Sequence, residues 1–105
     1  MSEILNKESV KRVEKSLRQF DMKLKIVVLE KTARTAIDAA NALQCELGAI
    51  IKSLVFKMGN QFMVCLVSGD KRCSLNKLKI ILNEKDVSMA NATQVKQNTG
   101  FSIGG

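Results

Sequence analysis

The sequence predicts an α+β protein in which helices pack against a mixed, mainly antiparallel sheet. Three observations lead to this class. Apolar residues recur at helical spacing near the start of the chain, two apolar runs are separated by Gly59-Asn60 as in a tight hairpin, and capping residues precede three further segments. Because 105 residues suffice for a single hydrophobic core, we expect one domain over 1–105.

The first part of the chain is expected to hold two helices with a strand between them. Residues 2–20 carry an apolar stripe with basic residues largely around it, which predicts an amphipathic helix. Residues 23–29 are mostly apolar and predict a strand. Thr35 is a suitable N-cap for a second helix with a stripe of small residues, and such a stripe allows close packing on a sheet. This stripe comprises Ala36, Ala39, Ala40 and Leu43.

The middle of the chain predicts an antiparallel hairpin. Residues 49–56 and 61–68 are apolar runs, and Gly59-Asn60 between them is typical of a two-residue turn. If Met58 pairs with Gln61, Lys52 lies opposite Val67. The same register places Cys65 opposite Leu54, where it is most economically a thiol of the core.

Lys52 is the residue that most needs an explanation, because it lies inside the apolar run AIIKSLVF. Alternation along a strand places it on one face with Leu54 and Phe56, and places Ser53 on the other. A charge among such neighbours must be paired, reach solvent with its head, or face a cavity. Lys52 is therefore either a functional group or a lysine whose head reaches the end of the strand.

The last third of the chain predicts two short helices and a short strand. Ser74 is a suitable N-cap for an apolar helix, and residues 86–90 predict the strand. Asn91, followed by Gln94, has the spacing of a capping box for a brief helix. Gly100 is a natural end for that helix.

The composition excludes several classes of function. The chain has no histidine, which excludes serine or cysteine catalysis through an imidazole and metal sites that contain histidine. Its three cysteines form no Cys-x-x-Cys pair, which argues against a disulfide framework and a zinc ribbon. We expect no metal and no cofactor. No apolar run is long enough to span a bilayer and no signal peptide is evident, so we expect a cytoplasmic protein without a membrane partner.

The formal net charge of +7 favours a polyanionic partner, because neutralised phosphates release counterions. A basic surface alone does not establish nucleic-acid binding. The chain has no Trp or Tyr and four Phe, which argues against a broad platform for base stacking. Recognition of a nucleic acid would therefore rest on backbone charge and a single pocket.

Four segments, in this order, resemble the YbaK-like aminoacyl-tRNA deacylases, a family that includes the editing domain of bacterial prolyl-tRNA synthetase and its free-standing relatives. They are 39–43 (AANAL), 52–56 (KSLVF), the turn Ser68-Gly69-Asp70 and 99–105 (TGFSIGG). The resemblance runs from about Thr35 to Gly105 and implies the fold of that editing domain. The chain stops at Gly105 and has no proline, whereas the family continues through a Gly-x-x-x-Pro loop, so we expect a fold that is incomplete at the C-terminus.

The resemblance also implies an activity. Such an enzyme hydrolyses, in trans, the ester that joins a wrong amino acid to the 3′ end of tRNA, in this case tRNA for proline carrying alanine, cysteine or serine. The expected partners are the mischarged tRNA and prolyl-tRNA synthetase. Loss of later strands would leave an open sheet edge, so self-association is also expected.

The resemblance implies two groups of site residues. The catalytic group is Lys52, Gly104 and Gly105, and the substrate-binding group is Ser53, Gly100 and Asp70. Several of them also have a simpler interpretation: Ser53 as a buried serine bonded to backbone, Asp70 in an ordinary turn, and the terminal glycines at a frayed end. The alternative function is a catalytically inactive remnant that binds tRNA or a protein, and a basic α+β domain of unrelated function is a third interpretation.

Overall fold

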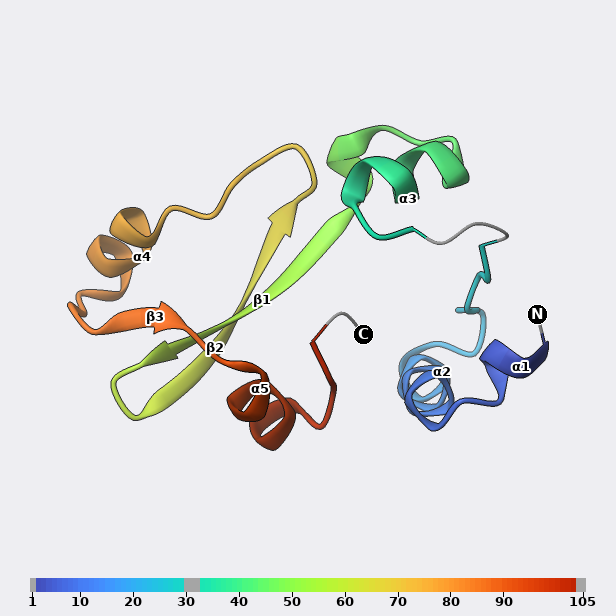
Figure 1. Cartoon of the computed structure of the whole chain (residues 1–105), viewed down its shortest axis with the longest axis horizontal. Coiled ribbons are helices and arrows are strands. Elements are labelled where there is room, and N and C mark those ends of the chain that lie inside the picture. The colour runs from blue at the N-terminus through green and yellow to red at the C-terminus, as the bar shows by residue number, and fades with distance from the viewer. Residues whose placement is uncertain (1, 30–32, 104–105) are drawn as a thin grey trace. The chain divides into compact units, whose positions relative to one another are not determined.

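The computed structural model describes residues 2–29 and 33–103. These residues form two compact units, one in each range, and each unit is described by itself (Figure 1). No helix in either range is long and apolar enough to cross a membrane. The single domain expected over 1–105 stays a prediction.

The first unit contains two helices where the sequence predicted one. Helix α1 spans Ser2–Leu5 and helix α2 spans Glu8–Phe20. The helix is interrupted at Lys7, whose backbone is extended with φ −67° and ψ 139°. The break falls directly after Asn6, a residue type that favours turns and caps over helix interiors. An ion pair of 3.7 Å between Arg18 and Glu14 lies along α2.

The prediction of a strand over residues 23–29 is wrong, because this segment has no regular secondary structure. Its backbone pairs with no strand, and both pairings of the described sheet involve other segments. The apolar side chain of Val27 is 67% exposed. An apolar run predicts a strand only where a partner edge is available, and local sequence carries no information about that edge.

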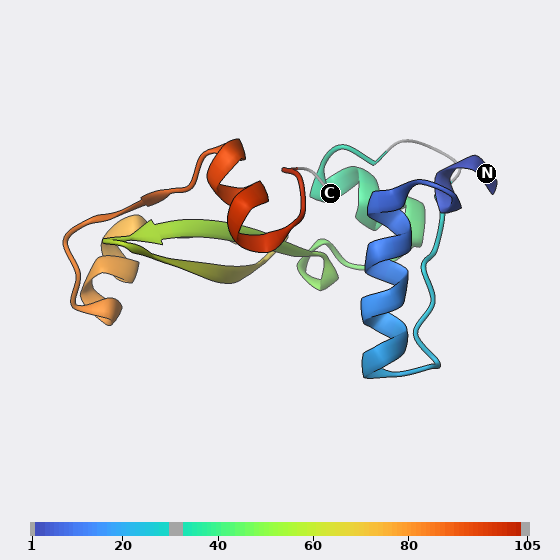
Figure 2. The same ribbon diagram turned by 90° about the horizontal axis from the view of Figure 1, so that it is seen from below.

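The second unit is an α+β fold, as predicted. Its elements are α3 (Ala36–Leu43), a 3-10 helix η1 (Leu47–Ala49), β1 (Ile51–Met58), β2 (Gln61–Ser68), α4 (Leu75–Leu82), β3 (Val87–Met89) and α5 (Ala92–Thr99). The strands form a sheet in the order β2-β1-β3, and both pairings are antiparallel. Helix α4 lies beside β3, and α5 lies along one side of the hairpin in both views (Figures 1 and 2).

The hairpin has the predicted register. Met58 pairs with Gln61 across the two-residue turn, Lys52 pairs with Val67, and Leu54 pairs with Cys65. Gly59 has a φ of 59°, the left-handed conformation that this turn requires and that glycine adopts readily. Register is thus set by the turn chemistry.

The helices of this unit begin where the capping residues predict. Thr35 Oγ1 accepts a hydrogen bond of 3.1 Å from the Asp38 amide, and Ser74 Oγ accepts one of 3.2 Å from the Lys77 amide. Asn91 opens a complete capping box. Helix α5 ends at Gly100, which is left-handed with φ 81°.

The core of the second unit is small. Its buried apolar residues are Ala40, Phe56, Val67, Val87 and Ala90. Phe56, only 2% exposed, lies on the face of β1 that also carries Lys52 and Leu54. The opposite face of the hairpin is open, because Ile51, Val64 and Leu66 are each more than half exposed. Lys52 therefore lies on the covered face of the sheet.

Candidate functional site

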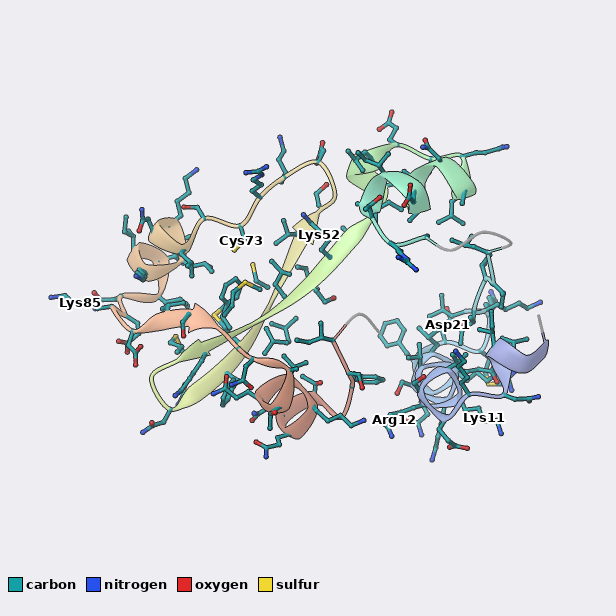
Figure 3. All side chains as sticks on the ribbon, viewed as in Figure 1. Lys11, Arg12, Asp21, Lys52, Cys73 and Lys85 are labelled. Carbon is teal, nitrogen blue, oxygen red and sulfur yellow. The ribbon has the colours of Figure 1, made fainter. Side chains whose placement is uncertain are left out.

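Lys52 is held at the end of the sheet by a backbone carbonyl. Its side chain, which Figure 3 labels, is half-buried. Its Nζ donates a hydrogen bond of 3.2 Å to the Lys71 carbonyl oxygen. An ammonium group has three donors, and the other two have no partner among the described residues. The lysine is thus partly anchored, and its head keeps hydrogen-bonding capacity for solvent or a ligand.

Ser68 joins the two segments that border this end of the sheet. Its Oγ lies 2.6 Å from the carbonyl oxygen of Gly48, which is in η1, and 2.7 Å from Asp70 Oδ1. A hydroxyl carries one proton and therefore donates to one of these acceptors at a time. The Gly48 carbonyl oxygen and the Asp70 carboxylate therefore share the Ser68 hydroxyl as a donor. No ion pair joins Asp70 to Lys52 in residues 2–29 and 33–103.

Gly69 allows the turn to pack very closely against neighbouring backbone. Its amide donates a hydrogen bond of 2.6 Å to the Ile50 carbonyl oxygen. A Cβ at this position would lie 2.5 Å from the Leu47 carbonyl oxygen and 3.2 Å from Ala36 Cβ. Only glycine fits between these groups without a shift of the backbone. The turn at Ser68-Gly69-Asp70 is therefore packed against both α3 and η1.

The charge around Lys52 is mainly positive. Lys71 and Arg72 follow the turn and are exposed, and Asp70 is the acidic residue beside them. The hydrogen bond from Ser68 lowers the pKa of Asp70, desolvation opposes this, and the positive charge of Lys71 adds to the lowering. Asp70 is consequently ionised at neutral pH. The site presents cations with one fixed carboxylate, which suits a ligand with both anionic and cationic groups.

The other predicted site residues are Ser53 on β1, Gly100 after α5, and the terminal Gly104 and Gly105. Ser53 is exposed on the face of β1 opposite Lys52, so it is not the buried serine of the simpler interpretation. Gly100 ends α5, and its carbonyl oxygen accepts a 3.1 Å hydrogen bond from Lys96 Nζ. Gly104 and Gly105 lie outside the described residues. The structure thus brings Lys52 and the Asp70 turn to one end of the sheet.

The segment after α5 is tied by Thr99. Its Oγ1 donates to the Val95 carbonyl oxygen at 2.7 Å and accepts from the Phe101 amide at 3.0 Å. These bonds fix the direction in which the chain leaves α5 after Gly100. The direction of the chain after α5 is therefore set by the hydrogen bonds of the Thr99 side chain as well as by the left-handed Gly100.

The arrangement suits electrostatic catalysis better than nucleophilic catalysis. No imidazole is available, and burial, together with the neighbouring Cys65 thiol, raises the pKa of Cys73, so Cys73 is a protonated, weak nucleophile at neutral pH. The described residues contain no group of three or more His, Cys, Asp or Glu residues that could hold a metal ion. What the site offers is a positioned ammonium, a fixed carboxylate and polar backbone groups.

Sequence reasoning gave no role to Ser68, Gly69 or the Lys71 carbonyl. The turn Ser68-Gly69-Asp70 was one of the matching segments, and a glycine directly after a strand is a known sign of close backbone approach. That sign could have identified Gly69. The bonds of Ser68 and Lys52 depend on how η1 and the 71–74 loop fold back, which local patterns do not predict.

The sequence matches the family model described as the aminoacyl-tRNA editing domain over residues 30–105. Among curated proteins, a proline–tRNA ligase from Thermosipho africanus is 35% identical over 77 residues, which are 73% of this chain and 14% of the ligase. A proline–tRNA ligase from Bacillus velezensis is 36% identical over 67 residues, 64% of this chain and 12% of the ligase. The match thus spans 12–14% of the length of these synthetases.

Among solved structures, a candidate trans-editing enzyme for prolyl tRNA synthetase superposes with a TM-score of 0.85 and 37% identity. The match covers 94% of this chain and 63% of that protein. A scaffold protein used for epitope grafting matches with a TM-score of 0.84 and 35% identity, over 93% of this chain and 63% of the scaffold. The fold is therefore shared with proteins of greater length.

Proposed function

This chain belongs to the aminoacyl-tRNA editing-domain family, and from that premise we propose that it is a deacylase acting in trans on mischarged tRNA. The substrate we favour is tRNA for proline that carries alanine, cysteine or serine. The observation that carries the proposal is the half-buried Lys52 ammonium, anchored by the Lys71 carbonyl at the end of the sheet with donors to spare. Small differences in side-chain size give weak discrimination at binding, which is why separate editing sites exist.

The reaction is the hydrolysis of an activated ester. The oxygen of a water molecule bonds to the ester carbonyl carbon, the bond from that carbon to the ribose oxygen breaks, and the ribose oxygen leaves with a proton. The products are a free amino acid and a tRNA with an intact 3′ end. An aminoacyl ester needs a positioned water and donors for the developing oxyanion, so the absence of histidine is compatible with this chemistry.

Each predicted residue has a role in this proposal. Lys52 binds the polar or phosphate groups at the 3′ end and orients the ester, and the backbone amides of Gly104 and Gly105 stabilise the oxyanion. Asp70, held ionised by Ser68, accepts a hydrogen bond from the α-ammonium group of the amino acid. Ser53 and Gly100 contact other parts of the substrate.

The proposed partners follow from the same premise. The chain binds the aminoacyl end of tRNA, and it acts beside prolyl-tRNA synthetase in the cytoplasm, where the mischarged tRNA arises. Its net charge of +7 favours the tRNA encounter. We also propose self-association through β2, an edge strand of the described sheet that carries no charged residue between Gln61 and Ser68.

The test is the release of labelled amino acid from alanyl-, cysteinyl- and seryl-tRNA for proline. Lys52→Met keeps the length of the aliphatic chain and removes the charge, so the fold should survive. We expect the rate to fall by about 100-fold or more, as for other positioned electrostatic groups. Lys77→Ala, which removes an exposed lysine from α4, is the matched control and should retain the parental rate.

Two outcomes would contradict the proposal. If folded parental protein releases no amino acid above the spontaneous rate, the chain is not an active deacylase, and a tRNA-binding or protein-binding role is favoured instead. If release is normal in Lys52→Met, the enzyme is active but Lys52 does not carry the reaction.

A further inference from the structure

Two of the three cysteines meet in the second unit, although eight positions separate them in the sequence. Cys65 lies on β2 and Cys73 lies in the loop between β2 and α4, where Figure 3 labels it. Their sulfur atoms are 3.8 Å apart, and both side chains are half-buried. The third cysteine, Cys45, is exposed, so the structure separates one thiol pair from one lone thiol.

The pairing results from the way the chain turns at the end of β2. Gly69 bonds to the Ile50 carbonyl oxygen, and the Lys71 amide donates to the Ser68 carbonyl oxygen at 2.9 Å. These bonds hold the turn that follows β2, and the loop after the turn brings Cys73 beside Cys65.

The pair lies next to the candidate site. Cys65 is opposite Leu54, and the next residue on the same face of β1 is Lys52. Cys73 follows Lys71 by two residues, and the carbonyl of Lys71 accepts the hydrogen bond from Lys52. A bond between the two sulfurs would therefore tether to β2 the loop that anchors the lysine.

We propose that Cys65 and Cys73 are a reversible thiol–disulfide pair that cross-links the loop of residues 69–74 to β2. A disulfide has an S–S distance of about 2.05 Å, so the sulfurs need to approach by roughly 2 Å through side-chain rotation and small loop shifts. The proposal rests on this geometry and is independent of the deacylase activity.

The oxidant is a low-molecular-weight disulfide such as oxidised glutathione. One protein thiolate attacks a sulfur of glutathione disulfide, whose S–S bond breaks, and one glutathione leaves. The second protein thiol loses its proton and attacks the protein's own sulfur in the mixed disulfide, which expels the other glutathione. The protein loses two electrons and two protons, and two glutathione thiols are formed. Excess reduced thiol reverses both steps.

The first experiment uses the full chain with Cys45→Ser, which leaves only the pair. The protein is incubated with oxidised glutathione at mildly alkaline pH, because the raised pKa of Cys73 slows its reaction at neutral pH. We expect the loss of two alkylatable thiols and of two hydrogens of mass in a monomer, both restored by dithiothreitol.

Trypsin then shows where the bond lies. Cleavage after Lys57, Lys71, Arg72 and Lys77 places the two cysteines in separate peptides, 58–71 and 73–77. We expect these peptides to remain linked in the digest until reductant is added. Cys65→Ser and Cys73→Ser, each combined with Cys45→Ser, should retain a single thiol and give mixed disulfides with glutathione only.

Three results would overturn the proposal: two alkylatable thiols retained after incubation, a stable mixed disulfide at one or both cysteines without the linked peptides, or linkage found only between two chains. None of these readouts involves tRNA. The disulfide proposal can therefore fail while the proposed deacylase function holds, and the reverse is equally possible.

Discussion

At the scale of single residues, Gly69 lies so close to neighbouring backbone that a side chain would not fit without a shift. An added Cβ would lie 2.5 Å from the Leu47 carbonyl oxygen, which belongs to backbone and cannot rotate away. We expect Gly69→Ala to lower the free energy of unfolding by about 1–3 kcal/mol, as for other overpacked sites. Chemical denaturation measures this. Gly48→Ala should cost less, because its nearest contact, at 3.1 Å, is the movable end of the Asp70 side chain.

The carboxyl group of Asp70 gives a second prediction at this scale. Because Ser68 lowers its pKa in the folded chain, ionised Asp70 stabilises the fold above the unfolded pKa, and this stabilisation is lost as the pH falls through the folded pKa. Ser68→Ala should raise the pKa of Asp70, which an NMR titration of the carboxyl carbon measures. Ser74→Ala, which removes a hydroxyl that caps α4, should leave the Asp70 titration in place. An unchanged midpoint in Ser68→Ala would contradict this account.

The residues of the site differed in how far the sequence predicted them. The position of Lys52 opposite Val67 followed from the two-residue turn, since a turn of known length sets the register of the whole hairpin. The bond from Ser68 to Asp70 could not be predicted in this way. It depends on side-chain rotation and on where η1 brings the Gly48 carbonyl, and neither has a local sequence signal.

At the scale of elements, two helices are followed by a non-glycine residue in the left-handed conformation. Gln44 after α3 and Asn83 after α4 are both left-handed, with φ of 55° and 52°. Glutamine has a Cβ that opposes this conformation, whereas asparagine tolerates it better. We expect Gln44→Gly to raise the free energy of unfolding by about 0.5–1 kcal/mol, measured by thermal or chemical denaturation.

Asn83→Gly is the matched comparison, because it changes the same kind of helix end from a more favourable start. Its gain should be smaller than that of Gln44→Gly. Equal gains at the two positions would contradict the view that asparagine tolerates the left-handed conformation better than glutamine here.

The elements that sequence predicted well are those with local signals. Thr35, Ser74 and Asn91 each bond to an amide three residues later, so the start of each helix is encoded within one turn of chain. The strand expected over residues 23–29 failed because pairing is a property of two segments. The single helix expected over 2–20 is divided at Lys7, because an amphipathic pattern predicts the face of a helix and not its interruptions.

At the scale of the whole molecule, the described sheet leaves apolar surface and a strand edge open. Val64 and Leu66 on β2 are 53% and 68% exposed, and the strand order leaves one edge of β2 unpaired within residues 33–103. Edge strands of this kind associate unless a charge or a proline blocks them, and β2 has neither. The proposed self-association therefore involves β2, the strand that also carries Cys65 and Val67.

We expect the apparent mass of the parental chain to rise with concentration in light scattering after size exclusion. Leu66→Lys places a charge on the open face of β2 and should shift the chain toward monomer, since lysine on an exposed edge strand opposes association. Ile80→Lys is the matched control, because Ile80 is 78% exposed on helix α4 and belongs to no strand, so the change should leave association through β2 unchanged. A monomer at every concentration would contradict self-association. Equal association of the two lysine variants would mean that another surface carries it.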